Sequence, residues 1–329
     1  MQEQPDRAKD VSSSGASLPG RESLPWGRRL RYRLEHLVGW AVLKTLGLLP
    51  RPAAYRFSYL LAALLRWSSP QFRRVADANL RMALPQLTPE ERAAICREAY
   101  RSLGRLLAEC AHFPRLTPGN VTETVFYDGL EHYQAARARG RGVLFLTAHL
   151  GAWELGAFAH GLCGYPIHVL YRPLDNPWLD RLVRRYRTMG GNRLIDKRES
   201  VRAVLAALAR NETVGILADQ NSSLEEGVFV DFFGIPASTT AGIARLALRT
   251  GAAVVPAFCL WEAEARKFRI CFEPALELRV SGNNEQDIRA ATQQMAAAVE
   301  QYIRRYPGQW LWIHRRWKTR PPGEPPLYS

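Results

Sequence analysis

The chain has 329 residues, with 45 Lys and Arg against 31 Asp and Glu, a formal net charge of +14, and 47% hydrophobic residues. This composition excludes a disordered or collagen-like chain, and the length allows one large α/β domain or two smaller ones. The positive charge favours anionic partners, such as nucleic acid, an acidic protein, a phosphorylated lipid or a membrane surface. The five cysteines are far apart and lie in apolar stretches, so we expect reduced thiols in a cytoplasmic compartment.

The start of the chain is predicted to be a tail followed by an apolar segment. Residues 1–27 are polar, rich in Ser, Gly and Pro, and lack the apolar run of a signal peptide, so they are predicted to form a disordered tail. The apolar run from Leu37 to Leu49 follows four arginines and contains Lys44. It has about 13 residues, whereas a bilayer-spanning helix needs about 20. The run is typical either of an interfacial helix on an anionic leaflet or of a buried core helix.

Three more helices are predicted before residue 115. Pro52 and Pro70 stand at the starts of two segments with helical spacing and arginine-rich polar faces. The third helix follows Thr88, which is a suitable N-cap, with Pro89 in the first helical position and acidic residues in the first turn. Residues 28–115 are therefore expected to form a helical, membrane-associated subdomain.

After Pro114 the pattern changes to short strands that alternate with helices. The predicted strands lie within residues 124–129, 142–148, 166–172, 192–195, 213–219 and 252–260. Segments 142–148 and 213–219 are almost continuously apolar, as a central strand covered on both faces requires. The predicted fold class is α/β, with a mixed, mostly parallel sheet flanked by helices. Residues 116–320 form the predicted core, and residues 321–329 a flexible C-terminus.

Polar residues stand at the ends of three of these strands, at the kind of sheet edge where α/β proteins bind ligands. His149 comes directly after strand segment 142–148, and Glu154 lies five residues further on. If His149 lies in the turn, Glu154 in the next helix can accept a hydrogen bond from one imidazole nitrogen and leave the other nitrogen as a base. The alternative is a histidine that only caps the helix.

Other strand ends carry further polar side chains. Arg172 ends one predicted strand, and Asp219 and Gln220 follow another. Each has an ordinary alternative, because Arg172 can be a surface cation paired with Asp175, and Asp219 can be a helix cap or a turn residue. Since parallel strands end at one edge, the sequence predicts that these side chains converge with His149 on one cleft.

Two basic segments of the sequence allow more than one interpretation. Residues 181–198 contain seven Arg and Lys residues, which is typical either of a solvated helix face or of a docking surface for an acidic partner. Near the C-terminus, Trp310, Trp312 and Trp317 alternate with basic residues, a mixture that suits a membrane interface or the stacking of single-stranded nucleic acid. A basic nucleic-acid-binding protein is thus an alternative, although no nucleic-acid-binding motif is present and the strand-end cluster stays unexplained by it.

The chain resembles the late acyltransferases of lipid A biosynthesis over about residues 37–318. The resemblance rests on five blocks in the same order, which are AHLGAWE with His149 and Glu154, YRPLDNPWLD with Arg172, GILADQN with Asp219 and Gln220, VFVDFFGIPASTTAGIARLALRTGAAVVPAF, and YPGQWLWIHRRWK. It implies an enzyme on the cytoplasmic face of the inner membrane that transfers a fatty acyl group from acyl carrier protein to a hydroxyl of a lipid A precursor. Mannoside acyltransferases of actinobacteria share the His–Glu block, so another glycolipid or phospholipid acceptor, such as a phosphatidylinositol mannoside, stays open.

The chemistry implied by this resemblance assigns a role to each candidate residue. His149 is the general base for the acceptor hydroxyl, and Glu154 orients it. Arg172 binds an anionic group through two parallel hydrogen bonds, and Asp219 and Gln220 position Arg172 or the acceptor.

The motifs of other enzyme classes are absent from the sequence. No GxSxG elbow and no cysteine near the predicted strand ends is found, so direct transfer is expected, without an acyl-enzyme. With no HExxH, P-loop or GxGxxG motif, no metal and no cofactor is expected. The expected partners are acyl carrier protein, an anionic glycolipid acceptor and the membrane surface, and not nucleic acid.

Overall fold

The computed structural model describes residues 25–328, except for the side chains of residues 199 and 200. Residues 1–24 of the predicted disordered tail lie outside the described residues, whereas Trp26 and Gly27 belong to the first helix. The helices are α1 (Trp26–Leu48), α2 (Arg51–Ser68), α3 (Pro70–Ala83), α4 (Pro89–His112), α5 (Leu130–Ala138), α6 (Trp153–Leu162), α7 (Pro177–Thr188), α8 (Ser200–Ala209), α9 (Gly242–Thr250) and α10 (Asn284–Arg305). The strands are β1 (Val125–Asp128), β2 (Val143–Thr147), β3 (Ile167–Tyr171), β4 (Arg193–Asp196), β5 (Thr213–Leu217), β6 (Gly227–Phe232), β7 (Ile235–Thr240), β8 (Ala253–Glu262) and β9 (Lys267–Phe272).

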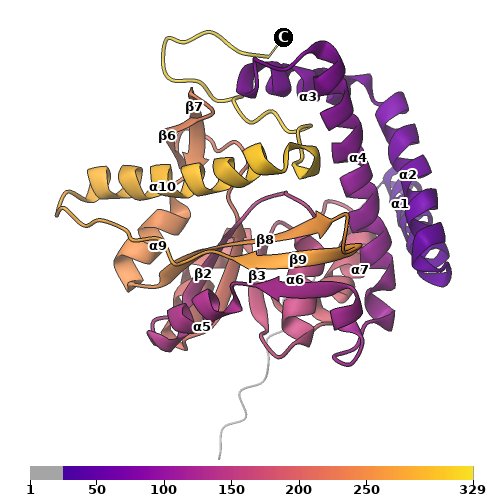
Figure 1. Ribbon diagram of the computed structural model, residues 1–329, viewed down its shortest axis with the longest axis horizontal. Helices are drawn as coiled ribbons and strands as arrows, with labels where there is room; N and C mark the ends of the chain where they lie inside the picture. Colours follow the sequence, from indigo (N-terminus) through magenta and orange to yellow (C-terminus); the bar gives the residue numbers. More distant parts are fainter. Residues whose placement is uncertain (1–24, 329) are drawn as a thin grey trace, which may run out of the picture.

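The central sheet of the described residues has seven strands in the order β1-β9-β8-β2-β5-β3-β4 (Figure 1). The five neighbouring strands β8, β2, β5, β3 and β4 run parallel to one another. β9 pairs antiparallel with β8, and β1 pairs parallel with β9, so these two strands run in the opposite direction. The predicted α/β class with a mixed, mostly parallel sheet flanked by helices is therefore confirmed. The parallel pairing brings the carboxyl ends of β2, β3 and β5 to one edge, where His149, Arg172 and Asp219 follow.

Helices cover both faces of this sheet, which explains the apolar sequence of β2. Leu144 and Leu146 belong to the core shared with α3, α8, α9 and α10, whereas Val143 and Phe145 belong to the core shared with α4, α5 and α6. Successive side chains of a strand point to opposite faces, so a strand covered on both sides is apolar at every position.

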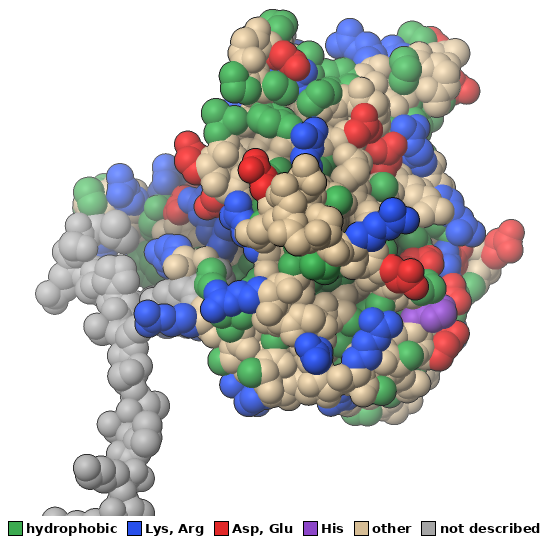
Figure 2. All heavy atoms as spheres, turned by 90° about the vertical axis from the view of Figure 1, so that its left-hand side faces the viewer, with side chains coloured by type: hydrophobic (Ala, Val, Ile, Leu, Met, Phe, Trp, Pro, Cys, Tyr) green, Lys and Arg blue, Asp and Glu red, His purple; other side chains and the backbone are tan. Residues whose placement is uncertain are grey.

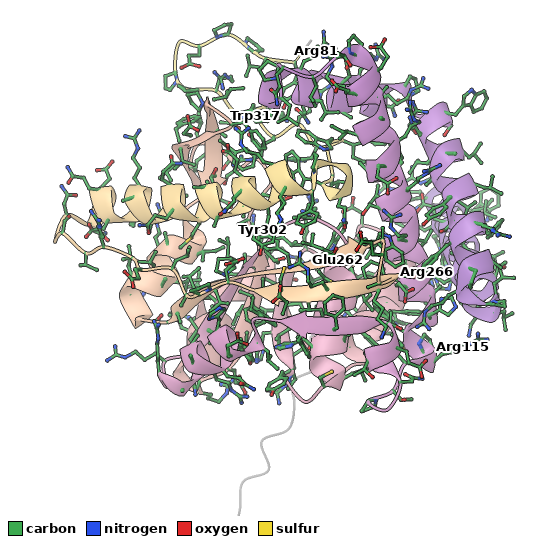
Figure 3. All side chains as sticks on the ribbon, in the orientation of Figure 1. Arg81, Arg115, Glu262, Arg266, Tyr302 and Trp317 are labelled. Atoms are coloured by element: carbon green, nitrogen blue, oxygen red, sulfur yellow. The ribbon has the colours of Figure 1, made fainter. Side chains whose placement is uncertain are left out.

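A hairpin formed by β6 and β7 was not predicted from the sequence, and neither was β9. The hairpin turn consists of Phe233 and Gly234, whose φ values are 61° and 77°. A two-residue turn with positive φ at both positions matches the twist of the strands, but it usually carries Asn or Asp before the glycine. Because Phe233 stands where Asn or Asp is usual, the sequence does not indicate this turn. Trp317 packs on the hairpin (Figure 3), with its ring centroid 6.0 Å from that of Phe232.

The N-terminal helices pack on α4 by close contacts of small residues. A Cβ atom on Gly104 of α4 would lie 3.1 Å from the carbonyl oxygen of Ser58 on α2, so the absence of a side chain at this position allows the two helices to approach this closely.

The predicted start of α4 is confirmed by a capping box, in which the Glu91 N–H donates to Thr88 Oγ1 (3.2 Å) and the Thr88 N–H donates to Glu91 Oε2 (2.8 Å). Among the described helices, none combines the length and apolarity needed to cross a membrane.

The C-terminal residues pack on the rest of the chain through Tyr328. Tyr328, which lies in the segment predicted to be flexible, donates a hydrogen bond to Asn79 Oδ1 (2.6 Å) and accepts one from the Trp317 N–H (3.0 Å).

On the face shown in Figure 2, Lys and Arg side chains are spread among Asp and Glu side chains instead of gathering in one patch. The net positive charge is therefore distributed on this face.

Candidate active site

His149 lies in the turn between β2 and α6, as predicted, and contacts from two other segments fix this turn. The Gly151 N–H donates to the Gln309 carbonyl (2.9 Å), and the Ala152 N–H donates to the Cys259 carbonyl (2.7 Å). Gly151 has φ +64°, and a Cβ atom there would lie 2.1 Å from the Cys259 carbonyl oxygen. Only glycine combines this φ with so close an approach of the two chains.

Asp219 holds the imidazole of His149. The His149 Nδ1 is 2.9 Å from Asp219 Oδ1, and Asp219 Oδ2 accepts hydrogen bonds from the His149 N–H (3.0 Å) and from Trp310 Nε1 (2.8 Å). Asp219 is buried, with 3% exposure, so its carboxylate depends on these donors. A carboxylate that accepts from Nδ1 places the proton on Nδ1 and leaves a lone pair on Nε2.

The charges of this pair shift both pKa values toward the ionised forms. Burial lowers the pKa of His149, but the charge and hydrogen bond of Asp219, and more weakly the charge of Glu154, outweigh it and raise the pKa above the usual value. Burial raises the pKa of Asp219, but the imidazole of His149 and the Trp310 N–H outweigh it and lower the pKa. Asp219 is therefore ionised at neutral pH, and His149 is a stronger base than a free imidazole.

Gln220 lies at the open side of the imidazole. Its Nε2 is 3.5 Å from His149 Nε2, and its side chain is exposed. Because 18% of the His149 side chain is exposed, a ligand can approach Nε2 from this side. The predicted convergence of His149, Asp219 and Gln220 on one sheet edge is thus observed.

Glu154 does not make the predicted hydrogen bond to His149. Its carboxylate accepts two parallel hydrogen bonds from Arg187 of α7, from Nε to Oε2 (2.9 Å) and from Nη2 to Oε1. The reason is that Asp219 occupies Nδ1, while Arg187 offers a planar pair of N–H groups on the neighbouring helix. Glu154 therefore acts on His149 through its charge, and Asp219 is the residue that orients the imidazole.

Arg172 follows β3 at the expected edge but does not join the cluster. Its side chain is 81% exposed, and Asp175, with an oxygen 3.9 Å from its guanidinium, is the carboxylate it approaches. This geometry matches the alternative of a surface cation. Arg187, which the sequence analysis placed only within a basic segment, lies beside the site instead.

The tryptophans near the C-terminus are core residues. Trp310, Trp312 and Trp317 are 2%, 1% and 0% exposed. The interpretation of these rings as a membrane interface or a nucleic-acid stacking platform is therefore wrong. Trp310 stabilises Asp219, and Trp312 donates from Nε1 to the Pro307 carbonyl (2.7 Å).

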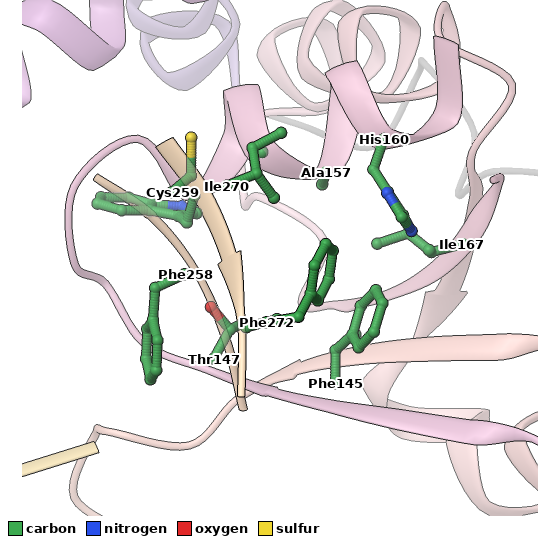
Figure 4. A pocket seen from close by; sticks show the side chains of 13 residues that line it. Phe145, Thr147, Ala157, His160, Ile167, Phe258, Cys259, Ile270 and Phe272 are labelled. Carbon is green, nitrogen blue, oxygen red and sulfur yellow. The ribbon is translucent and has the colours of Figure 1, made fainter. Parts of the chain in front are cut away.

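An apolar cavity lies on the α6 side of the sheet (Figure 4), one residue shell away from His149. It has a volume of about 60 Å³, and its lining includes Thr147 at the end of β2 and Trp153 at the start of α6. The Trp153 ring packs edge-on against His149, with centroids 5.0 Å apart. Trp153 therefore stands between the imidazole and the apolar space.

Comparison with known proteins identifies the family of the chain. A family model described as bacterial lipid A biosynthesis acyltransferase matches residues 25–319. The chain is 31% identical to the lipid A biosynthesis palmitoleoyltransferase of Escherichia coli over 281 residues, which cover 85% of this chain and 90% of the relative. It is 30% identical to the lauroyltransferase of the same organism over 302 residues (91% and 95%), and 27% identical to its myristoyltransferase over 252 residues (77% of each). The chain therefore belongs to the family of bacterial lipid A biosynthesis acyltransferases.

Proposed function

We propose that this acyltransferase moves a fatty acyl group from acyl carrier protein to a hydroxyl of a lipid A precursor, with His149 as the general base and Asp219 as its orienting partner. Family membership supports acyl transfer in lipid A biosynthesis. The observation that carries the mechanism is the His149–Asp219 pair, which leaves Nε2 of a partly exposed imidazole free to act as a base. A thioester donor is already activated, so the protein has to supply a base and stabilise the tetrahedral intermediate.

The proposed reaction is a direct transfer in two steps. His149 Nε2 takes the proton of the acceptor hydroxyl while the hydroxyl oxygen bonds to the thioester carbonyl carbon, which gives a tetrahedral oxyanion. The oxyanion then collapses, the carbon–sulfur bond breaks, and the leaving thiolate receives the proton from Nε2. The products are an ester and a thiol. Gln220, 3.5 Å from Nε2, is placed to donate to the oxyanion.

A covalent acyl-enzyme is disfavoured by the state of the nearest cysteine. Cys259, which lies within β8 and not at its end, lines the cavity. Burial raises the pKa of its thiol well above the usual value, which keeps it protonated at neutral pH. A protonated thiol is a poor nucleophile, so the acceptor oxygen is the better attacking group.

The experiment that tests this function is incubation of the purified protein with acyl-loaded acyl carrier protein and a lipid A precursor, with the products identified by mass spectrometry. We expect a precursor heavier by one acyl group and free carrier thiol in equal amounts. A parallel reaction with a phosphatidylinositol mannoside tests the alternative acceptor. Acylation of that lipid with no acylation of the precursor would contradict the proposal.

The basic face of α7 is the proposed docking surface for the acidic carrier protein. Arg181, Arg184 and Arg185 are exposed on α7, which packs beside α6 and contributes Arg187 to the site. Exposed cations mainly raise the association rate, and salt screens their effect. The three arginines therefore support this docking surface without contributing to the chemical step.

Glu154→Gln is expected to shift the pH profile to lower pH. The Glu154 charge raises the pKa of His149, and in this variant the Arg187 guanidinium, whose charge lowers it, also loses its ionic partner. Both changes lower the pKa of His149, so the acidic limb of kcat/KM moves down in pH, and the limb position is the measurement. An unchanged limb in a folded variant would show that Glu154 does not act on His149.

Arg172→Lys is expected to keep kcat within about twofold of the wild type. The side chain is highly exposed, and its ion pair with Asp175 is loose, so it contributes little in water. Steady-state kinetics with varied acceptor measure kcat and KM separately. A large fall in kcat would mean that Arg172 reaches the reacting atoms in the complex.

We also propose that the face formed by α1 and α2 binds the cytoplasmic surface of the inner membrane. Both helices lie along one side of the molecule (Figure 1) and carry exposed apolar side chains. These include Leu37, Val38, Leu60, Leu64 and Trp67, which are between 56% and 73% exposed. Basic residues on the same helices suit an anionic leaflet, and such helices bind in the plane of the interface.

Replacing Leu60, Leu64 and Trp67 by Gln is expected to weaken binding to anionic vesicles by at least about tenfold, because a buried leucine contributes about 1.5–3 kcal/mol. The control is Val280→Gln, since Val280 is equally exposed, at 74%, outside these helices. Vesicle co-sedimentation at low and high salt measures binding. Equal loss in the control, or none in the triple variant, would contradict the assignment.

A further inference from the structure

The cavity beside His149 extends along α6 toward the opposite edge of the sheet. Trp153, in the first turn of α6, and His160, near its end, both line it. Seven residues separate them, which corresponds to about 10 Å along a helix. The cavity therefore leads from Trp153, which packs on His149, toward the amino-terminal ends of the parallel strands.

Ile167 closes the far end of this cavity. Ile167, at the start of β3, lies beside His160 in Figure 4. It also lines a second cavity of about 180 Å³, whose lining includes Tyr165, Glu212 and Arg193 at the amino-terminal ends of the strands. Because one side chain borders both spaces, Ile167 is the partition between an apolar space and a polar one.

His160 gives this end wall a fixed and uncharged surface. Its ring stacks on Tyr165, with centroids 5.1 Å apart, and its Nδ1 is 3.0 Å from the hydroxyl of Tyr127. Burial lowers the pKa of His160 to about 3, so the imidazole is neutral at neutral pH. A neutral ring held on two sides is compatible with an apolar ligand and leaves it little freedom to move aside.

Gly215 of β5 provides the room in front of this wall. A Cβ atom at this position would lie 3.3 Å from Ile167 Cδ1. The next nearest atom, the His168 carbonyl oxygen, would be 3.9 Å away. Gly215 does not have a positive φ, so an alanine fits the backbone. The strand itself does not require a glycine here, and an alanine would take up cavity space and press on Ile167.

We infer that Ile167 and Gly215 determine the length of the acyl chain that the protein transfers, with Ile167 as the end stop and Gly215 as the space before it. The inference rests on the proposed function. An acyl chain whose carbonyl lies at His149 Nε2 enters past Trp153, and the carbons at its end occupy this cavity of about 60 Å³ as far as Ile167. A longer chain has to displace Ile167 or leave methylenes outside, and a shorter chain leaves part of the cavity empty.

The test is the acyl-chain profile of kcat/KM, measured with a series of saturated acyl carrier protein donors that differ by two carbons. Ile167→Ala removes the partition, so the preferred chain should become longer. Gly215→Ala fills the gap, so it should become shorter. Each misplaced methylene is expected to change kcat/KM by about fourfold, the equivalent of about 0.8 kcal/mol. Two carbons therefore change the ratio of neighbouring donors by more than about tenfold.

The control variant is Ile195→Ala, which makes the same truncation at a buried residue of β4 in the core on the other face of the sheet. Its profile should match the wild type, with thermal unfolding measured for all variants. If Ile167→Ala does not fold, the chain-length profile of Gly215→Ala still tests the inference, because this substitution removes no contact. Coincident profiles in wild type and both cavity variants would overturn the inference and leave the proposed function standing. A wild-type protein that transfers no chain would overturn both.

Discussion

Replacing His149 by Ala is expected to lower kcat/KM by about 10²–10⁴-fold, the usual contribution of a general base. The protein should still fold, because Asp219 keeps its hydrogen bonds from Trp310 and from the main-chain N–H of residue 149. Acyl transfer and circular dichroism measure the two effects. His132→Ala is a suitable control, since His132 lies on α5, before β2 and away from the site edge.

Turnover near the wild-type level in His149→Ala would show that another group takes the proton. His314 is the candidate to consider, since it lies close enough to Asp219 and His149 for their charges to act on it. Its Nε2 accepts a hydrogen bond from the Asn221 N–H (3.0 Å). Burial lowers the pKa of His314, and its acceptor nitrogen is already occupied. We therefore expect no such rescue.

Asp219→Asn is the second substitution with a large expected effect. An amide can donate from its NH₂ group to Nδ1, which moves the imidazole proton to Nε2 and removes the lone pair that accepts the acceptor proton. We expect a loss of kcat/KM of about 10²–10⁴-fold, similar to that of His149→Ala.

The pH profile of Asp219→Asn separates this role from a structural one. The Asp219 charge raises the pKa of His149 in the wild type, so removal of the charge lowers that pKa. The base is active when deprotonated, and the acidic limb of the remaining activity should therefore move to lower pH. A lower rate with an unmoved limb would indicate that Asp219 only supports the fold.

The strand ends were predictable from local sequence, but the partner of His149 was not. Glu154 lies five residues from His149, so distance along the sequence favours it as the partner. Asp219 reaches the imidazole because β5 is the direct neighbour of β2 in the sheet. Strand order depends on how the whole chain packs, so no local pattern distinguishes Asp219 from Glu154 as the hydrogen-bond partner.

Arg172 and Arg187 show a related limit. Arg172 lies at the end of a predicted strand, whereas Arg187 lies in the basic segment 181–198. The position at a strand end favours Arg172 as the site residue. Whether an arginine points into the site depends on the packing of α7 against α6, which gives Arg187 a carboxylate partner and leaves Arg172 in solvent. A planar guanidinium paired with a carboxylate on the next helix is visible only in the folded chain.

The C-terminal tryptophans were misjudged because alternation with basic residues describes two environments equally well. Arg316, at 1% exposure, is as deeply buried as Trp312 and Trp317. Its guanidinium donates to the Ser238 carbonyl (2.7 Å) and to Thr239 Oγ1 in β7. A charged residue among apolar ones suggests an exposed surface unless its hydrogen-bond partners are known, and these come from the hairpin that the sequence analysis missed.

The measurement that tests the central claim most directly is a double-mutant cycle on kcat/KM with wild type, His149→Ala, Asp219→Asn and the double variant, at one pH and with one donor and acceptor. If the two residues form a single base unit, the double variant should fall no further than His149→Ala alone, because Asp219 has nothing left to orient. If the logarithmic losses of the single variants add in the double variant, Asp219 acts independently of His149, and the assignment of a His149–Asp219 base is wrong.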